Sequence, residues 1–285
     1  NEALIHLDAL QHPHGRARAC APDAQVWAVV KANGYGHGLT RVFEGLRATD
    51  GFALLDIDEA RRLRELDWRG PILLLEGVFE PRDLEMCSRL GLWHVVHCEQ
   101  QIDWLAQHKT EWPHRVFLKM NTGMNRLGLR LEEAKALVQS FDGLRGLSID
   151  LVISHLACAS EPAHPANGAQ RARFQEARSL FPEARASLAN SAGVFLGQDY
   201  LFDLVRPGIS LYGGGPFGVS HPALRPVAHL TAPILQVREV RPGESVGYGA
   251  TFTAEKPVRA AIIAAGYADG VLRSFGKAGQ VWLGG

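Results

Sequence analysis

Residues 29–38 of the chain are Val29-Val30-Lys31-Ala32-Asn33-Gly34-Tyr35-Gly36-His37-Gly38, in which a lysine leaves an apolar run and precedes three closely spaced glycines. The whole run, Gln25–Ala32, predicts a buried β-strand, and the glycines predict a turn after it. Buried lysines are rare unless they are paired or reactive. Lys31 is therefore either an ordinary lysine that reaches solvent at a strand end or an amine held at a barrel mouth, where it can form a Schiff base with a carbonyl.

Seven similar runs follow along the chain, and segments with helical spacing lie between them. The clearest predicted helices are Asp58–Leu66, Pro81–Leu90, Leu131–Phe141 and Gln170–Leu180. Strands that alternate with helices predict a parallel sheet, and eight of them predict an α/β fold of the (β/α)8 TIM-like barrel type. The eight predicted strands are Gln25–Ala32, Gly51–Ile57, Pro71–Gly77, Trp93–Cys98, Arg115–Asn121, Ile149–Ala157, Ala186–Ser191 and Leu201–Val205.

The sequence pattern changes after the eighth run, and this change predicts a second domain. The glycine-rich segment Gly213–Pro216 is followed by alternating segments at Thr231–Val240 and Arg259–Ala264. Alternation of apolar and polar residues is typical of strands with one solvated face. We expect a barrel over residues 1–225 and the start of a mainly β C-terminal domain over residues 226–285.

The composition argues against several classes of protein. Thirty Lys and Arg residues balance thirty Asp and Glu residues, so the chain lacks the positive surplus that nucleic-acid binding requires. No apolar stretch approaches the roughly 18 to 20 residues of a membrane span, and the first residues do not resemble a signal peptide. We expect a cytoplasmic enzyme with reduced thiols, because the four cysteines lack the spacing of a zinc site or a disulfide framework. They are Cys20, Cys87, Cys98 and Cys158.

Residues able to do chemistry follow the predicted strands at their C-terminal ends, where the loops of a barrel build its active site. Lys31 follows the first strand, and Arg126 and Arg206 follow the fifth and the eighth. Ser191 follows the seventh, where it is either an anion ligand or an ordinary helix cap. His155 follows the sixth and, taken alone, would be a structural histidine. Together these groups suit pyridoxal 5'-phosphate (PLP), which offers a carbonyl, a ring nitrogen and a phosphate.

The residues around Lys31 closely resemble the PLP-lysine signature of bacterial alanine racemases. Six further motifs of that family follow in order, so the resemblance spans nearly the whole chain. It implies a PLP-dependent isomerase that interconverts L- and D-alanine as a homodimer with active sites shared between subunits. The D-alanine would serve the peptidoglycan of the cell wall, or the activity would serve alanine catabolism. The motifs are residues 29–38, 121–128, 154–155, 190–193, 206–213, 243–252 and 266–270.

The resemblance assigns two acid/base residues. Lys31 would hold PLP as an aldimine and move a proton on one face of the substrate Cα, while Tyr248 of the partner subunit would act on the opposite face. Arg126 would contact the phenolic oxygen of PLP and the substrate carboxylate, and Tyr267 would border the substrate. Lys119 matches a lysine that is carbamylated in some members, which would let it orient Arg126.

The resemblance also assigns residues that cradle the cofactor. Arg206 would contact the pyridine nitrogen, and because arginine does not readily give up a proton, PLP would be a weaker electron sink than with a carboxylate partner. His155 would link Arg206 to the catalytic tyrosine. Asn121 stands where the family motif commonly has an aspartate. The remaining predicted cofactor ligands are Tyr35, Asn190, Ser191, Gly208 and Ile209.

The end of the sequence differs from the family pattern. Family members continue beyond the position of Gly285, and the last run, Val281–Gly285, predicts a strand and a turn with no partner. We therefore expect the chain to be cut short within its second domain.

Other functions are compatible with parts of the pattern. A serine or broad-specificity racemase would share every motif. A non-catalytic PLP-binding barrel would keep the lysine of the first strand but lack the domain with Tyr248, and a PLP decarboxylase would place an acidic residue where this chain has Arg206. A metal-dependent barrel hydrolase could use His94, His97 and His155, although the first two differ in parity along a strand and would point to opposite faces.

Overall fold

The computed structural model describes residues 1–110, 113–140, 147–219, 221, 224–277, 279 and 281. The chain divides into two compact units: Ile5–Val227 forms one, and Asn1–Leu4 joins Ala228–Gly285 in the other. An eight-stranded sheet lies in the first unit, and the remaining described strands form two-stranded sheets.

Eight parallel strands form the sheet of the first unit, in the order β8-β7-β6-β5-β4-β3-β2-β9. The first and last strands of this order also bond to each other, because the N–H of Asp203 donates to the carbonyl of Ala186 and that of Arg206 to the carbonyl of Ala189, each at 3.0 Å. The sheet therefore closes, and the predicted (β/α)8 barrel is confirmed. The strands are β2 (Gln25–Val29), β3 (Gly51–Leu54), β4 (Ile72–Leu74), β5 (Trp93–Val96), β6 (His114–Lys119), β7 (Leu147–Ile153), β8 (Arg185–Ser187) and β9 (Leu204–Val205).

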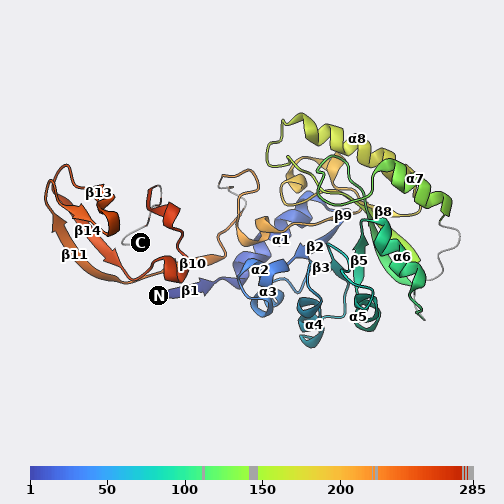
Figure 1. Ribbon diagram of the computed structural model, residues 1–285, viewed down its shortest axis with the longest axis horizontal. Coiled ribbons are helices and arrows are strands. Elements are labelled where there is room, and N and C mark those ends of the chain that lie inside the picture. Colours follow the sequence, from blue (N-terminus) through green and yellow to red (C-terminus); the bar gives the residue numbers. More distant parts are fainter. Residues whose placement is uncertain are drawn as a thin grey trace. The chain divides into compact units, whose positions relative to one another are not determined.

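Helices alternate with these strands along the chain and cover the outside of the barrel (Figure 1). Helix α4 begins after Asp56, whose carboxylate accepts a hydrogen bond from the N–H of Asp58. Helix α5 ends at Gly91, whose φ of 58° suits glycine. In the described part of the chain, no helix is long and apolar enough to cross a membrane. The helices are α1 (Leu7–Cys20), α3 (Leu39–Gly45), α4 (Ile57–Glu65), α5 (Asp83–Leu90), α6 (Glu99–Gln107), α7 (Leu131–Ser140) and α8 (Pro165–Ser179), while the segment labelled α2 (Lys31–Tyr35) is a left-handed turn.

Two layers of apolar side chains stabilise the barrel. Along β2, Trp27 belongs to the cluster inside the barrel, whereas Ala28 belongs to the cluster between strands and helices. The ring of Trp27 packs inside against Trp93 and Phe117, with centroids 5.2 and 5.5 Å apart. Because both faces of a barrel strand are covered, the strands are continuous apolar runs, which is the pattern that predicted them.

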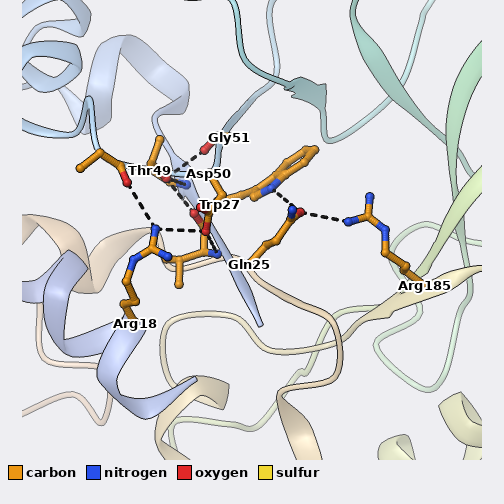
Figure 2. Close-up of polar contacts among 10 residues, drawn as sticks. Arg18, Gln25, Trp27, Thr49, Asp50, Gly51 and Arg185 are labelled. Atoms are coloured by element: carbon orange, nitrogen blue, oxygen red, sulfur yellow. Dashed lines mark hydrogen bonds and ion pairs between the residues drawn. The ribbon is translucent and has the colours of Figure 1, made fainter. Parts of the chain in front are cut away.

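Polar contacts fix the start of β2 at the end of the barrel where the strands begin (Figure 2). The carboxylate of Asp50 accepts from Arg18 at 3.1 Å and from the N–H of Val26 at 2.8 Å. The hydroxyl of Thr49 donates to the carbonyl of Val26 at 2.8 Å, and Gln25 accepts from the indole of Trp27 at 3.3 Å. These contacts stabilise the strand register at this end of the barrel. In barrels of this type the active site lies at the opposite end, where the strands finish.

The ends of several elements differ from the prediction. The first strand stops at Val29 instead of Ala32, because the chain turns sharply at Lys31. The eighth predicted strand, Leu201–Val205, keeps only its last two residues as β9, since Phe202 has a φ of 50° that no strand adopts. The predicted helix Leu131–Phe141 is α7, and Phe141 lies outside the described residues.

The second unit is mainly β, as predicted. Strand β1 (Glu2–Ile5) pairs with β10 (Ala228–Thr231). The longest pair is antiparallel and joins β11 (Ile234–Val240) to β14 (Val258–Ile263), and the antiparallel strands β12 (Ser245–Val246) and β13 (Phe252–Thr253) flank a loop. Residues 282–285, which belong to the predicted last strand and turn, lie outside the described residues.

Candidate active site

A cavity of about 290 Å³ opens at the end of the barrel where the strands finish. It collects residues that lie far apart in the sequence, because they stand at or after the C-terminal ends of five strands, β2, β6, β7, β8 and β9. Every predicted site residue of the barrel lines this cavity: Lys31, Tyr35, Lys119, Arg126, His155, Asn190, Ser191, Arg206, Gly208 and Ile209.

Lys31 enters the cavity from a left-handed turn. The residues after it, Ala32, Asn33 and Gly34, have φ between 54° and 63°, and Tyr35 continues with φ 52°. Such backbone is unfavourable for residues with a Cβ atom, so contacts elsewhere must stabilise it. The turn brings both Lys31 and Tyr35 to the cavity wall.

A small polar cradle lies where Tyr35 meets the segment after β9. Gly208 packs so closely on the hydroxyl of Tyr35 that an added Cβ would overlap it. The hydroxyl of Ser191 accepts from the N–H of Gly208 at 2.8 Å and from the N–H of Ser210 at 3.3 Å. The ring of Tyr35 stacks on Tyr212 with centroids 4.6 Å apart, which fixes its orientation. The hydroxyls of Tyr35 and Ser191, together with the backbone of Gly208, form a candidate binding site for an anion.

Arg206 is 3% exposed and is fixed by three acceptors. Its guanidinium donates to the carbonyl of Ser154 at 2.6 Å, to the carbonyl of Leu188 at 3.5 Å and to the hydroxyl of Ser187. Burial lowers the pKa of Arg206 to about 9, which still leaves it charged at neutral pH. It therefore faces the cavity as a fixed cation.

Lys119 ends β6 and is 8% exposed. Burial, followed by the charges of Arg206, Arg126 and Lys31, lowers the pKa of Lys119 to about 8, although Glu76 acts in the opposite direction. A substantial part of Lys119 is therefore neutral under mildly alkaline conditions.

A tight loop after β6 carries Arg126. Met120 pairs with Leu129, and the N–H of Asn121 donates to the carbonyl of Leu129 at 2.8 Å, which closes the base of the loop. The Asn121 side chain accepts from the N–H of Asn125 at 3.1 Å. Gly128 permits the closure, since its φ is 122° and a Cβ there would overlap the backbone of Met120. Asn121 thus stabilises the loop that presents Arg126.

His155 and Asn190 contact each other across the cavity wall. The amide Nδ2 of Asn190 lies 3.3 Å from Nε2 of His155 and 3.2 Å from the carbonyl of Leu156. Burial and the charges of the nearby cations, Arg206 first among them, hold the pKa of His155 well below its usual range. His155 is therefore neutral, and its Nε2 accepts the bond from Asn190. Its predicted link between Arg206 and a tyrosine stays a prediction.

The two predicted residues of the second unit are exposed in the single chain. Tyr248 lies in the loop between β12 and β13 and is 97% exposed, and Tyr267 is 75% exposed. The residues that line the barrel cavity do not include either of them. Of the two predicted acid/base residues, Lys31 is the one that lines the cavity.

Glu76 is the residue that sequence reasoning missed in this cavity. It is the carboxylate among the lining residues, and its charge acts to raise the pKa of Lys119. Glu76 is the next-to-last residue of the third predicted strand, Pro71–Gly77, so the rule that strand ends carry the chemistry would have found it.

The structure does not bring together the three histidines of the metal-hydrolase alternative. Of these three, His155 alone lines the cavity. The side chain of His94 contacts His114 at 3.3 Å, and that of His97 contacts Gln101 at 3.3 Å. Across the described residues, no group of three histidine, cysteine or acidic side chains is arranged to hold a metal ion.

Comparison with protein families decides between the remaining alternatives. The model of the alanine racemase N-terminal domain matches residues 5–216, and that of the C-terminal domain matches residues 227–285. The chain belongs to the alanine racemase family. A non-catalytic PLP barrel would lack the second domain, so the match over residues 227–285 argues against it.

Individual relatives and solved structures support the same family assignment. An alanine racemase of Polaromonas sp. is 54% identical over 278 residues, which are 95% of this chain and 76% of that protein. The biosynthetic alanine racemase of Pseudomonas aeruginosa has the same fold, with a TM-score of 0.91 and 39% identity over 95% of this chain and 77% of that one. The alanine racemase of Bartonella henselae, with covalently bound pyridoxal phosphate, matches with a TM-score of 0.86 and 32% identity over 96% and 77% of the two chains.

Proposed function

We propose that this chain interconverts L- and D-alanine with PLP held on Lys31. The observation that carries the proposal is the meeting of Lys31, a polar cradle and two arginines, Arg126 and Arg206, in one cavity of a protein of this family. The D-alanine would serve cell-wall peptidoglycan, or the same activity would serve alanine catabolism.

The residues of the cavity fit PLP. Arg126 and Arg206 give the lining two positive charges against one carboxylate, Glu76, which suits a phosphate and a phenolate. The cradle of Tyr35, Gly208 and Ser191, with Ile209 beside it, would hold the phosphate, because a side chain at 208 would fill the space that the Tyr35 hydroxyl occupies. Asn190 and His155 would line the cofactor on its other side.

Racemisation removes a proton from one face of the substrate Cα and adds one on the opposite face, so an acid/base group on each face serves it. When bound, PLP withdraws electrons from Cα and makes its proton acidic. Lys31 would move the proton on the face toward the barrel, and Tyr248 on the opposite face. Arg126 would hold the substrate carboxylate, and Tyr267 would limit the space beside the side chain of alanine.

Fixed charges would keep this chemistry selective. Arg206 would donate to the ring nitrogen, and its charge state at neutral pH supports a ring that stays unprotonated. We also propose that Lys119 is carbamylated: its amine would add to carbon dioxide and release a proton, and the resulting carbamate would orient Arg126. The lowered pKa of Lys119 supports this, since only the neutral amine reacts.

We propose a homodimer in which Tyr248 of the partner subunit completes each site. The exposure of Tyr248 and the large apolar side chains that the second unit leaves exposed support this arrangement. Free cysteines support a reducing, cytoplasmic location. The exposed apolar residues of the second unit include Leu230, Leu235, Phe252 and Leu272.

Borohydride capture tests the assignment of Lys31. The chain is incubated with PLP, the bond between lysine and cofactor is reduced, and the labelled peptide is identified. We expect the label on Lys31, a loss of label in Lys31→Ala and its retention in Lys119→Ala, which alters the other lysine of the cavity. Formation of D-alanine from L-alanine is measured in parallel. Label on Lys119 alone, or racemisation that survives Lys31→Ala, would contradict the proposal.

A further inference from the structure

The backbone after Lys31 adopts a conformation that its own residues disfavour. Ala32 and Asn33 both lie in the left-handed helical region, at φ 55° and ψ 52° and at φ 54° and ψ 47°. Hydrogen bonds within the turn, such as that from the N–H of Gly34 to the carbonyl of Val30 at 2.9 Å, are also available to other turns. A contact outside the turn that favours this conformation would therefore offset the strain, above all that of Ala32.

Glu59 of α4 makes that contact. Its Oε1 accepts a hydrogen bond of 2.5 Å from the N–H of Asn33, in the middle of the left-handed residues. The Asn33 side chain in turn accepts from the N–H of Leu39 at 2.9 Å, which connects the turn to the start of α3. A bond from a neutral N–H to a carboxylate is stronger than one to an amide oxygen, so the charge of Glu59 matters.

The second oxygen of Glu59 points to a function beyond capping. Oε2 is buried and has no hydrogen-bond partner within the described part of the chain. Burying a carboxylate oxygen without a donor is unfavourable, so Glu59 has a cost in stability that a neutral side chain would avoid. The amphipathic helix α4 would also form with a neutral side chain at residue 59. What a neutral side chain would weaken is the hydrogen bond from the N–H of Asn33.

We infer that Glu59 is a positioning residue, which places Lys31 and Tyr35 in the cavity by fixing the left-handed turn between them. This inference rests on the proposed role of Lys31 as the lysine that binds PLP. If the turn relaxed to right-handed backbone, Tyr35 would leave its place between Gly208 and Tyr212. The phosphate cradle and the lysine would then no longer face the same ligand.

The experiment compares Glu59→Gln, which keeps the shape but not the charge, with Glu59→Ala, which removes the acceptor. Glu65→Gln is the control, because Glu65 is an exposed residue of the same helix. In the full chain without cofactor, amide hydrogen exchange of residues 32–35 is measured. We expect exchange to speed up roughly ten-fold or more in Glu59→Ala and less in Glu59→Gln, with no change in Glu65→Gln.

With PLP added, the same proteins report on positioning. We expect PLP affinity to fall roughly ten-fold in Glu59→Ala and the circular dichroism of bound PLP to weaken, since its orientation is less fixed. Adding Ala32→Gly should restore much of both, because glycine adopts the left-handed conformation readily. A merely structural role of Glu59 would not respond to a glycine in the turn.

Two results would overturn the inference. One is exchange and PLP dichroism in both Glu59 variants that match those of Glu65→Gln. The other is a loss that Ala32→Gly does not restore. Failure of the proposed function looks different: in the unaltered protein PLP would not label Lys31, while Glu59→Ala would still speed up exchange in the cofactor-free turn.

Discussion

At the scale of single residues, the contact between Gly208 and Tyr35 shows how a missing side chain shapes a site. An added Cβ at residue 208 would overlap the Tyr35 hydroxyl, whereas Gly168 on α8 has nothing within 4 Å of the same position. We expect Gly208→Ala to weaken PLP binding roughly ten-fold or more, because it displaces a hydroxyl that would bond to a charged phosphate.

PLP titration with thermal unfolding checks this expectation. The control, Gly168→Ala, should leave PLP affinity unchanged. If the clash with the hydroxyl is the cause, Gly208→Ala should have little further effect in a Tyr35→Phe background. Equal losses in both backgrounds would contradict the explanation.

At the scale of elements, a row of three histidines connects β5, β6 and the residue that directly follows α6. Nε2 of His94, which is fully buried, lies 3.3 Å from Nδ1 of His114, and His114 lies 3.0 Å from His108. Burial, then the neighbouring imidazoles, lowers the pKa of His94 to about 3, and burial, then His108, lowers that of His114 to about 4. In the unfolded chain both would titrate near 6.5, so below that pH the unfolded state binds more protons.

The fold should therefore lose stability as the pH falls from 7 toward 4. For His94 the expected loss in the free energy of unfolding between pH 7 and pH 5 is about 2 kcal/mol. Denaturant unfolding at several pH values measures it. His94→Gln, which does not titrate, should flatten the dependence, and an identical slope in the variant would show that other groups cause it.

The sequence could predict elements with a regular pattern better than those that depend on contacts. The eight strands were visible as apolar runs because both of their faces are buried, and the strand-end rule placed Lys31, Arg206 and His155 at one mouth. The left-handed turn was not visible, since Ala32 ordinarily favours right-handed backbone and the contact of the turn with Glu59 joins residues 26 positions apart. Glu59 itself sits in an ordinary helical pattern, which hides its contact.

At the scale of the whole molecule, the proposed site needs two chains. Lys31 lines the barrel cavity, while Tyr248 belongs to the second unit and is exposed. We expect Lys31→Ala and Tyr248→Phe each to abolish efficient racemisation. If equal amounts of the two variants are unfolded together, refolded and assayed, activity should return to roughly a quarter of the unaltered level, because half of the random dimers would contain one intact site out of two.

The control for this mixture pairs Lys31→Ala with the double variant Lys31→Ala and Tyr248→Phe, which cannot form an intact site in any combination. No recovery in the first mixture, although refolded unaltered protein regains its activity, would mean that Lys31 and Tyr248 act within one chain or that Tyr248 is not the second base. Recovery that grows with protein concentration would further indicate that dimer formation creates the site, since association follows mass action.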